Sequence, residues 1–289
     1  MRYRVKHVTT YRYSEHVALS HNLVHLAPRS TPTQRMLDCS LRVDPNPTNL
    51  DRFNDAFGNH QVLFTVQRDH ESLRITSLST VDVQPAPPDP IDPAWETVRD
   101  YLATSHDSAA LDMAEFCYQS PLVPTGADLA AFANEHFTPG LGLLAATDAL
   151  TRHIFTAWKY DPTATNLSTP VHEVLAKRAG VCQDFAHLAI AALRSIGLSA
   201  RYVSGYLETD PAPGSTKLRG ADASHAWFQI AVPQYGWIDF DPTNNCRASE
   251  RHITCAYGRD FGDVTPTRGL ILGGGSAKIQ VGVDVDALP

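Results

Sequence analysis

Gly180-Val181-Cys182-Gln183-Asp184-Phe185-Ala186-His187-Leu188 is the stretch from which the organisation of this chain follows. The apolar residues from position 185 onward recur at the i, i+3, i+4, i+7 spacing of one buried helical stripe. They are Phe185, Leu188, Ala189, Ala192, Leu193 and Ile196. Gly180 interrupts the segment before this stripe, and Gly197 ends it. The pattern predicts a helix with Cys182 in its first turn or just before it.

The position of Cys182 suggests a chemical role. Backbone N–H groups in the first turn of a helix lack intrahelical acceptors, and the helix dipole favours an anion there. A thiolate is the nucleophilic form of cysteine, so a cysteine at this position is a candidate nucleophile. The alternative is an inert buried cysteine, which is common in intracellular proteins. A base elsewhere in the chain is needed to decide between them.

Length, composition and charge indicate how many domains to expect and which kinds of partner are unsupported by the sequence. The chain has 289 residues, 43% hydrophobic and 19% charged, with a formal net charge of −7. This length suits one large or two ordinary domains. The chain contains no run rich in Lys and Arg, so the sequence does not suggest a nucleic-acid partner. We find no signal-type apolar core near the start and no apolar stretch long enough to span a bilayer, so we expect a cytoplasmic protein without a membrane partner.

The cysteines and histidines show no familiar metal or disulfide spacing. Five cysteines are scattered without paired spacing, which argues against a disulfide framework. They are Cys39, Cys117, Cys182, Cys246 and Cys255. The HxxxH pair His21 and His25 lacks an obvious third ligand, and no run of alternating acidic residues resembles a calcium loop. We therefore expect neither a metal site nor a cofactor.

The chain divides at a proline-rich connector. Residues 1–84 alternate apolar and polar side chains between turn signals, which predicts an N-terminal antiparallel β-sandwich. Residues 85–93 are predicted to form a stiff linker, because proline restricts the backbone and interrupts a sheet. The five prolines are Pro85, Pro87, Pro88, Pro90 and Pro93. Residues 94–289 form the predicted core.

In the core, the sequence pattern predicts helices first and strands after them. Helical periodicity covers Trp95–Leu102, Leu111–Cys117, Asp128–Phe137, Leu143–Trp158 and a segment from Ser168 to Gly180. A strand at Ala200–Leu207 follows the cysteine helix, and a loop at Glu208–Asp222 is expected to border the reaction cleft and shape specificity. Ala223–Val232 and Trp237–Phe240 form a hairpin. The predicted fold class is therefore α+β.

His225 is the candidate base, because it lies on the less apolar face of the first hairpin strand. An imidazole that serves a thiol needs an acceptor on its other nitrogen. Two acids share a face of the returning strand; with a turn near Gln234, Asp239 lies opposite Gln229 and Asp241 opposite Trp227. Asp241 is then diagonal to His225 and the nearer acceptor. Three other histidines have no placed partner and are interpreted as structural or solvated: His153, His172 and His187.

Four blocks of sequence, taken in order, resemble the bacterial transglutaminase-like superfamily. They are Gly180-Val181-Cys182-Gln183-Asp184, Ala200-Arg201-Tyr202-Val203-Ser204-Gly205-Tyr206, Ser224-His225-Ala226-Trp227 and Gly236-Trp237-Ile238-Asp239-Phe240-Asp241-Pro242-Thr243-Asn244. The N-terminal β region and the late segment from Tyr257 to Val264 resemble the bacterial subgroup with an N-terminal β domain. Carried over residue by residue, the family triad falls on Cys182, His225 and Asp241.

This resemblance implies a papain-like α+β core and acyl transfer through a thioester. The substrate would be a peptide or protein offering a peptide bond or an amide side chain. Hydrolysis, as in a cysteine peptidase or amidase, is the favoured outcome; transfer to an amine and a non-catalytic peptide-binding module are the alternatives. The Cys182 backbone N–H would stabilise the oxyanion, with Trp158 as a candidate second donor whose simpler role is packing. The sequence leaves the oligomeric state open.

Overall fold

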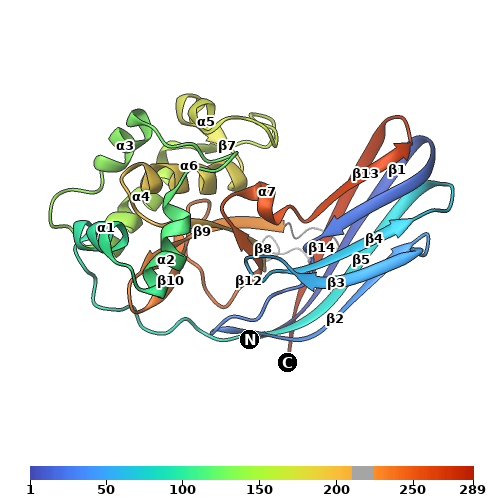
Figure 1. The fold of residues 1–289 in the computed structure, drawn as a ribbon, viewed down its shortest axis with the longest axis horizontal. Coiled ribbons are helices and arrows are strands. Elements are labelled where there is room, and N and C mark those ends of the chain that lie inside the picture. The colour runs from blue at the N-terminus through green and yellow to red at the C-terminus, as the bar shows by residue number, and fades with distance from the viewer. Residues whose placement is uncertain (210–223) are drawn as a thin grey trace, which may run out of the picture.

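The computed structural model describes residues 1–209 and 224–289 and has an α+β architecture (Figure 1). A long, curled antiparallel sheet lies beside a second antiparallel sheet that is covered by helices. The predicted fold class is confirmed; the N-terminal β region takes the form of a single curled sheet. Among the described helices, none is long and apolar enough to cross a membrane.

The curled sheet is built around one very long strand, β1 (Arg2–Val24). The other N-terminal strands are β2 (Gln34–Asp44), β3 (Asn49–Asn54), β4 (His60–Val66) and β5 (His70–Val83). Burial alternates along the first half of β1, where Tyr3 and Val5 are buried between exposed or half-buried neighbours. One face of the strand therefore packs into a core while the other meets solvent, as its sequence pattern predicted.

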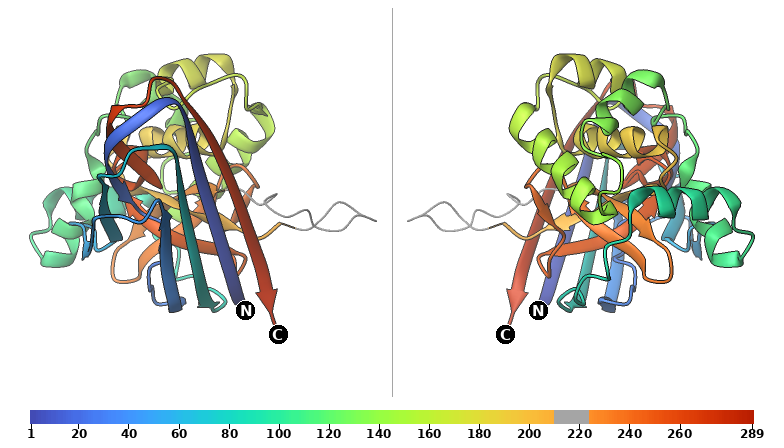
Figure 2. Two further views of the ribbon diagram at one scale, coloured as in Figure 1. Left: turned by 90° about the vertical axis from the view of Figure 1, so that its right-hand side faces the viewer. Right: turned by 90° about the vertical axis from the view of Figure 1, so that its left-hand side faces the viewer.

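Two strands from the end of the chain complete this sheet. They are β13 (Thr267–Gly273) and β14 (Ala277–Leu288), and both pair with β1. β14 runs along β1 from Arg2 opposite Leu288 to Tyr13 opposite Ala277, so the two termini lie close together (Figure 2). Val283 and Val285 of β14 pack in the same cluster as Tyr3 and Val5. The predicted core of residues 94–289 thus ends in two strands that pair with β1 of the curled sheet.

Most of the helices come before Cys182 in the sequence, and several of them pack around the helix that begins at Cys182. Its members are α1 (Trp95–Thr104), α2 (Ser108–Ala114), the 3-10 helix η1 (Glu115–Cys117), α3 (Ala127–Asn134), α4 (Leu143–Ala157), α5 (Val171–Lys177), α6 (Cys182–Ser195) and the short α7 (Phe261–Val264). The strands of the second sheet lie in the order β11 (Cys246–Arg247), β10 (Gly236–Asp241), β9 (Ser224–Val232), β8 (Ala200–Leu207) and β12 (His252–Gly258). A short parallel pair, β6 (Lys159–Tyr160) and β7 (Ala179–Gly180), precedes α6.

Helix α6 is the centre of the core. Every residue from Gln183 to Arg194 is buried, and α6 packs against β8, β9, α3, α4 and α5. Small residues at Ala186, Ala189 and Ala192 let neighbouring backbones approach closely, and burial of each large apolar side chain such as Leu188 stabilises the fold by about 1.5–3 kcal/mol. The first residue of α6 is consequently held by a rigid element.

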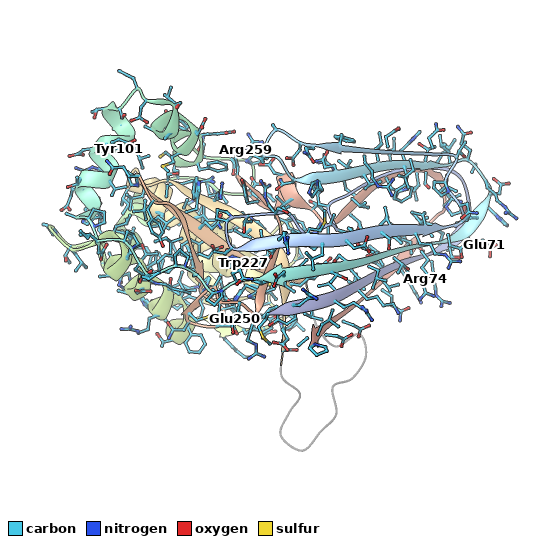
Figure 3. All side chains as sticks on the ribbon, turned by 90° about the horizontal axis from the view of Figure 1, so that it is seen from below. Glu71, Arg74, Tyr101, Trp227, Glu250 and Arg259 are labelled. Carbon is cyan, nitrogen blue, oxygen red and sulfur yellow. The ribbon has the colours of Figure 1, made fainter. Side chains whose placement is uncertain are left out.

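The curled sheet is joined to the core along the outer edge of β12. Gln34 donates from Nε2 to the Thr254 carbonyl (2.8 Å) and accepts from the Thr254 N–H at Oε1 (2.9 Å). Asn59 makes the same pair of bonds to the backbone of Tyr257, at 2.8 and 3.0 Å. Both amides are buried, so they replace the neighbouring strand that this edge lacks. Trp227 lies near this junction, whereas Glu71 and Arg74 mark the far end of the curled sheet (Figure 3).

Candidate active site

Cys182 is the first residue of α6 and is half-buried. The start of the helix is fixed by Asp184, whose Oδ2 accepts the Val181 N–H (2.8 Å) and the Thr165 hydroxyl (2.6 Å). Gly180 permits this arrangement, because a Cβ on it would lie 2.6 Å from Asp184 Oδ2 and 2.9 Å from Asp184 Cβ. The thiol is thus placed at the N-terminal end of a rigid, buried helix, where a helix dipole favours negative charge.

His225 and Asp241 come from the two strands of the predicted hairpin. Asp239 pairs with Gln229 and Phe240 with Phe228, which is the predicted register. In this register Asp241 is the acid within reach of His225, and its Oδ2 lies 2.7 Å from His225 Nε2. Gly205 pairs with His225 on the other side of β9. The structure therefore brings the predicted base and acid together.

The Cys182 thiol lies close enough to the His225 ring to affect the pKa of that ring. Nε2 of His225 faces Asp241, so Nδ1 is the nitrogen available to the thiol. Burial alone would lower the pKa of His225, but the hydrogen bonds and negative charges of Asp241 and Cys182 outweigh burial and raise that pKa to about 10. An imidazolium is therefore favoured at neutral pH, which is the charge state that pairs with a thiolate.

Asp241 is fully buried and its carboxylate is surrounded by donors. Oδ1 accepts the backbone N–H groups of Thr243 (2.9 Å) and Asn244 (3.2 Å). Oδ2 accepts from the Asn244 side-chain amide (2.7 Å) as well as from His225. Burial opposes ionisation, but the hydrogen bonds from His225, His252 and Asn244 prevail and hold the pKa of Asp241 well below its usual range. This carboxylate is thus held ionised and fixed in orientation.

His252 is a site residue that the sequence analysis missed. Its Nδ1 accepts the Ser249 backbone N–H (3.1 Å), so the proton of the neutral ring lies on Nε2. Nε2 is 3.1 Å from Asp241 Oδ2, the oxygen that also bonds His225. His252 is the first residue of β12, and no sequence spacing relates it to Asp241; the packing of β12 against β8 brings it there.

Asp239, the other acid of β10, bonds different residues from those that bond Asp241. It accepts from Trp227 Nε1 (2.6 Å) and Gln229 Nε2 (2.9 Å), and burial raises its pKa. The Trp227 ring stacks on the His225 ring at 29° with centroids 5.9 Å apart, while His252 meets Trp227 edge-on. Asp239 therefore orients the indole that packs on the base.

Other residues considered from the sequence lie apart from this group. Trp158 donates its indole N–H to the Val174 carbonyl (3.1 Å), so the structure corrects its suggested role as an oxyanion donor: the group is already bonded in the core. His187 is buried and accepts the Phe261 N–H (3.1 Å). His172 pairs with Asp128 (2.7 Å). The loop expected at Glu208–Asp222 lies outside the described residues from position 210 onward.

Two groups of side chains in the described ranges have the donor atoms to hold a metal ion. One is His225, Asp241 and His252, where the ring nitrogens and carboxylate oxygens already bond one another. The other is Glu135, His136 and His153, between α3 and α4. The HxxxH pair forms neither group: His21 bonds Thr65, and His25 bonds Gln61 and the Thr265 carbonyl.

Comparison with known proteins identifies two family regions in the chain. Residues 3–82 match the bacterial transglutaminase-like N-terminal region, and residues 131–242 match the transglutaminase-like superfamily. An uncharacterized protein of Mycobacterium tuberculosis is 40% identical over all of this chain and 93% of its own length. One of Mycobacterium leprae is 31% identical over 99% of both chains.

Two further relatives carry functional names. A protein-glutamine gamma-glutamyltransferase of Pseudomonas aeruginosa is 34% identical over 89 residues, which cover 30% of this chain and 13% of that protein. The crystal structure of a proposed cysteine protease from Cytophaga hutchinsonii superposes with a TM-score of 0.79 at 23% identity, over 100% of this chain and 91% of that one. At this identity the second likeness is one of fold.

Proposed function

The chain belongs to the bacterial transglutaminase-like superfamily, and from this premise we propose that it catalyses thiol-dependent acyl transfer on peptide or carboxamide bonds, with hydrolysis as the main outcome. The observation that carries the proposal is the chain of contacts from Cys182 through His225 to Asp241. A nucleophile, a base and an orienting carboxylate in series form the arrangement that activates a thiol.

The reaction would proceed in two halves. The Cys182 thiolate attacks the carbonyl carbon, and the His225 imidazolium gives its proton to the departing amine as the C–N bond breaks, leaving a thioester and a neutral imidazole. In the second half His225 removes a proton from water, the resulting hydroxide attacks the thioester, and the thiolate departs. Asp241 stays ionised and holds the ring through both halves.

The start of α6 supports stabilisation of the tetrahedral intermediate. The N–H of Cys182, as the first helical residue, has no intrahelical acceptor. A donor fixed at the place where negative charge develops is worth about 10²–10³ in rate in enzymes that use one. The second donor is left unassigned, since the indole of Trp158 is bonded to Val174.

Hydrolysis is favoured over amine transfer because Cys182 remains partly exposed, so water has access to a thioester there. Amide-forming transfer is the second candidate, and its support is the likeness of part of the core to the Pseudomonas glutamyltransferase. The two are separated by incubating the protein with a peptide library, with and without a labelled primary amine, and identifying the products by mass spectrometry. We expect shortened or deamidated peptides; amine incorporation in preference to hydrolysis would reverse the ranking.

A non-catalytic peptide-binding module is the remaining alternative. It is tested without knowledge of the substrate, by measuring the rate of iodoacetamide alkylation of Cys182 at mildly acidic pH. We expect faster reaction than a free thiol shows, and a large decrease in His225→Ala. Alkylation at the rate of a free thiol, unaffected by His225→Ala, would rule out the catalytic proposal.

A further inference from the structure

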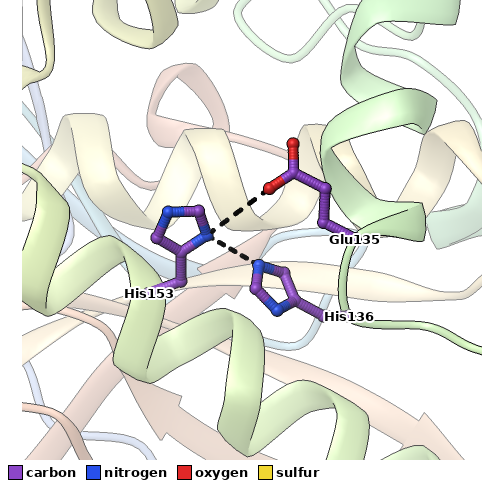
Figure 4. A group of neighbouring side chains, drawn as sticks. All are labelled: Glu135, His136 and His153. Atoms are coloured by element: carbon purple, nitrogen blue, oxygen red, sulfur yellow. Dashed lines mark hydrogen bonds and ion pairs between the residues drawn. The ribbon is translucent and has the colours of Figure 1, made fainter.

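A second cluster of ligand-type side chains lies away from the proposed active site. Helix α3 ends at Asn134, and the next two residues, Glu135 and His136, face His153 of α4 (Figure 4). Their sequence spacing matches no metal motif, because the two histidines are 17 positions apart. Packing of two helix segments, which the sequence could not reveal, brings the three side chains together.

The donor atoms of this cluster lie close to one another. His136 Nε2 lies 2.7 Å from His153 Nδ1, and Glu135 Oε2 lies 4.0 Å from the same nitrogen. One ligand atom from each of the three residues falls within 4.8 Å of the others. Both rings are half-buried and the carboxylate is exposed, so the cluster opens to solvent on the side of Glu135.

Two ring nitrogens at this separation share one hydrogen: the N–H of one neutral imidazole donates to the lone pair of the other. Without that hydrogen two lone pairs would oppose each other, and with two the N–H groups would collide. A metal ion can take the place of the shared proton. Tetrahedral zinc with bonds near 2.0–2.1 Å requires ligand atoms about 3.4 Å apart. The contacts of 2.7 and 4.0 Å lie on either side of that value, so small side-chain rotations suffice.

The surroundings hold the rings in place, and burial lowers the pKa of His136, which favours the neutral imidazole that ligates metals. Phe132 packs against both imidazoles, with centroids 6.1 Å from His136 and 5.5 Å from His153. Trp158 packs on His153 at 5.6 Å and is itself fixed by its bond to Val174. The cluster also lies directly after the C-terminal end of α3, where the helix dipole favours a cation.

We propose that Glu135, His136 and His153 form a binding site for a divalent transition-metal ion of the zinc class. Imidazole and carboxylate ligands suit zinc, nickel and copper rather than magnesium or calcium, which prefer oxygen ligands alone. Three protein ligands leave a position for water. Bound metal would link the end of α3 to α4 and stabilise the folded chain by mass action.

The test is calorimetric titration of the full chain with Zn²⁺, together with the absorption spectrum of the Co²⁺ adduct to show whether thiolates take part. We expect one equivalent bound without sulfur ligation, and a loss of affinity of at least about tenfold in His136→Gln and in His153→Gln. His172→Gln is the matched control: it removes another half-exposed imidazole that pairs with a single acid, Asp128, and binding should be unchanged.

Three results would overturn the proposal. They are absence of zinc binding by the wild-type chain, binding that survives both cluster substitutions, and binding abolished instead by His225→Gln. Glu135→Gln guards against misfolding, because its side chain is 60% exposed; it should weaken zinc binding and reduce the zinc-induced rise in Tm while leaving the metal-free Tm unchanged.

Discussion

His252 donates a hydrogen bond from Nε2 to Oδ2 of Asp241, the same carboxylate oxygen that bonds the base. The Ser249 N–H donates to Nδ1 of His252, which leaves the ring proton on Nε2. Asp241 is therefore held between two imidazoles, one that faces the thiol and one that faces the core. Both nitrogens of the inner ring are bonded, to Asp241 and to the Ser249 N–H, so we assign His252 a positioning role.

The first prediction concerns this positioning. His252→Ala should slow iodoacetamide alkylation of Cys182 by about tenfold and shift its pH profile, because Asp241 loses a donor that orients it. His252→Gln, whose amide can still donate, should restore part of the rate. His187→Gln is the control: His187 is equally buried but bonds Phe261, so it should lower stability without changing alkylation. Equal profiles for wild type and His252→Ala would contradict the assignment while leaving the triad untouched.

The second prediction separates the two acids of β10. Asp241→Asn keeps the shape of the side chain but removes the charge that favours the imidazolium, so kcat/KM should fall by about 10²–10⁴. Asp239→Asn, two residues earlier on the same face, should have a much smaller effect, since Asp239 bonds only Trp227 and Gln229 among the residues around the base. Comparable losses in the two variants would mean that the wrong acid has been assigned.

The third prediction is a pH dependence of stability. The pKa of His225 is raised to about 10 in the folded chain, from about 6.5 when unfolded. Its charged form therefore stabilises the fold fully below about pH 6.5, and this contribution is lost as the pH rises through about 10. Urea unfolding should show that His225→Gln is less stable than wild type at pH 6, with a difference that narrows by pH 10.5. A constant difference across this range would show that the charge does not contribute.

The fourth prediction tests the close packing behind His225. A Cβ on Gly205 would lie 2.1 Å from the Ile253 carbonyl oxygen and 2.6 Å from the Trp227 ring. Gly205→Ala should lower the free energy of unfolding by about 1–3 kcal/mol and slow alkylation of Cys182, because Trp227 must move away from the base. Gly140→Ala, where nothing lies within 4 Å but φ is +76°, should cost stability only and leave alkylation unchanged.

Local patterns predicted where Cys182, His225 and Asp241 lie in the fold. Helical periodicity after Gly180 placed Cys182 at the start of α6, and alternation about the turn near Gln234 gave the register that brings Asp241 to His225. The position of His252 could not be foreseen, because it depends on a strand that packs against β8 rather than on any repeat. The acceptor of the Trp158 indole could not be foreseen for the same reason, because Val174 lies on another helix.

The return of the chain to β1 also escaped prediction, although β14 alternates clearly. Alternation identifies a strand but does not identify its partner, and Val283 and Val285 could have been buried against either sheet. Pairing between Arg2 and Leu288 is a contact at the greatest sequence separation that the sheet contains. Patterns of adjacent residues carry no information about such a contact.

That pairing also bears on how the sheet is completed during synthesis. β1 is translated before β14, the strand that covers one of its sides, and the segments that carry Cys182, His225 and Asp241 are translated between them. During synthesis β1 therefore presents an unpaired edge, the kind of surface that promotes aggregation of nascent chains. The helices and strands that carry Cys182, His225 and Asp241 can form before the sheet closes. A chain whose synthesis has not reached β14 contains every residue of the proposed triad, while β1 still lacks the strand that covers one of its sides.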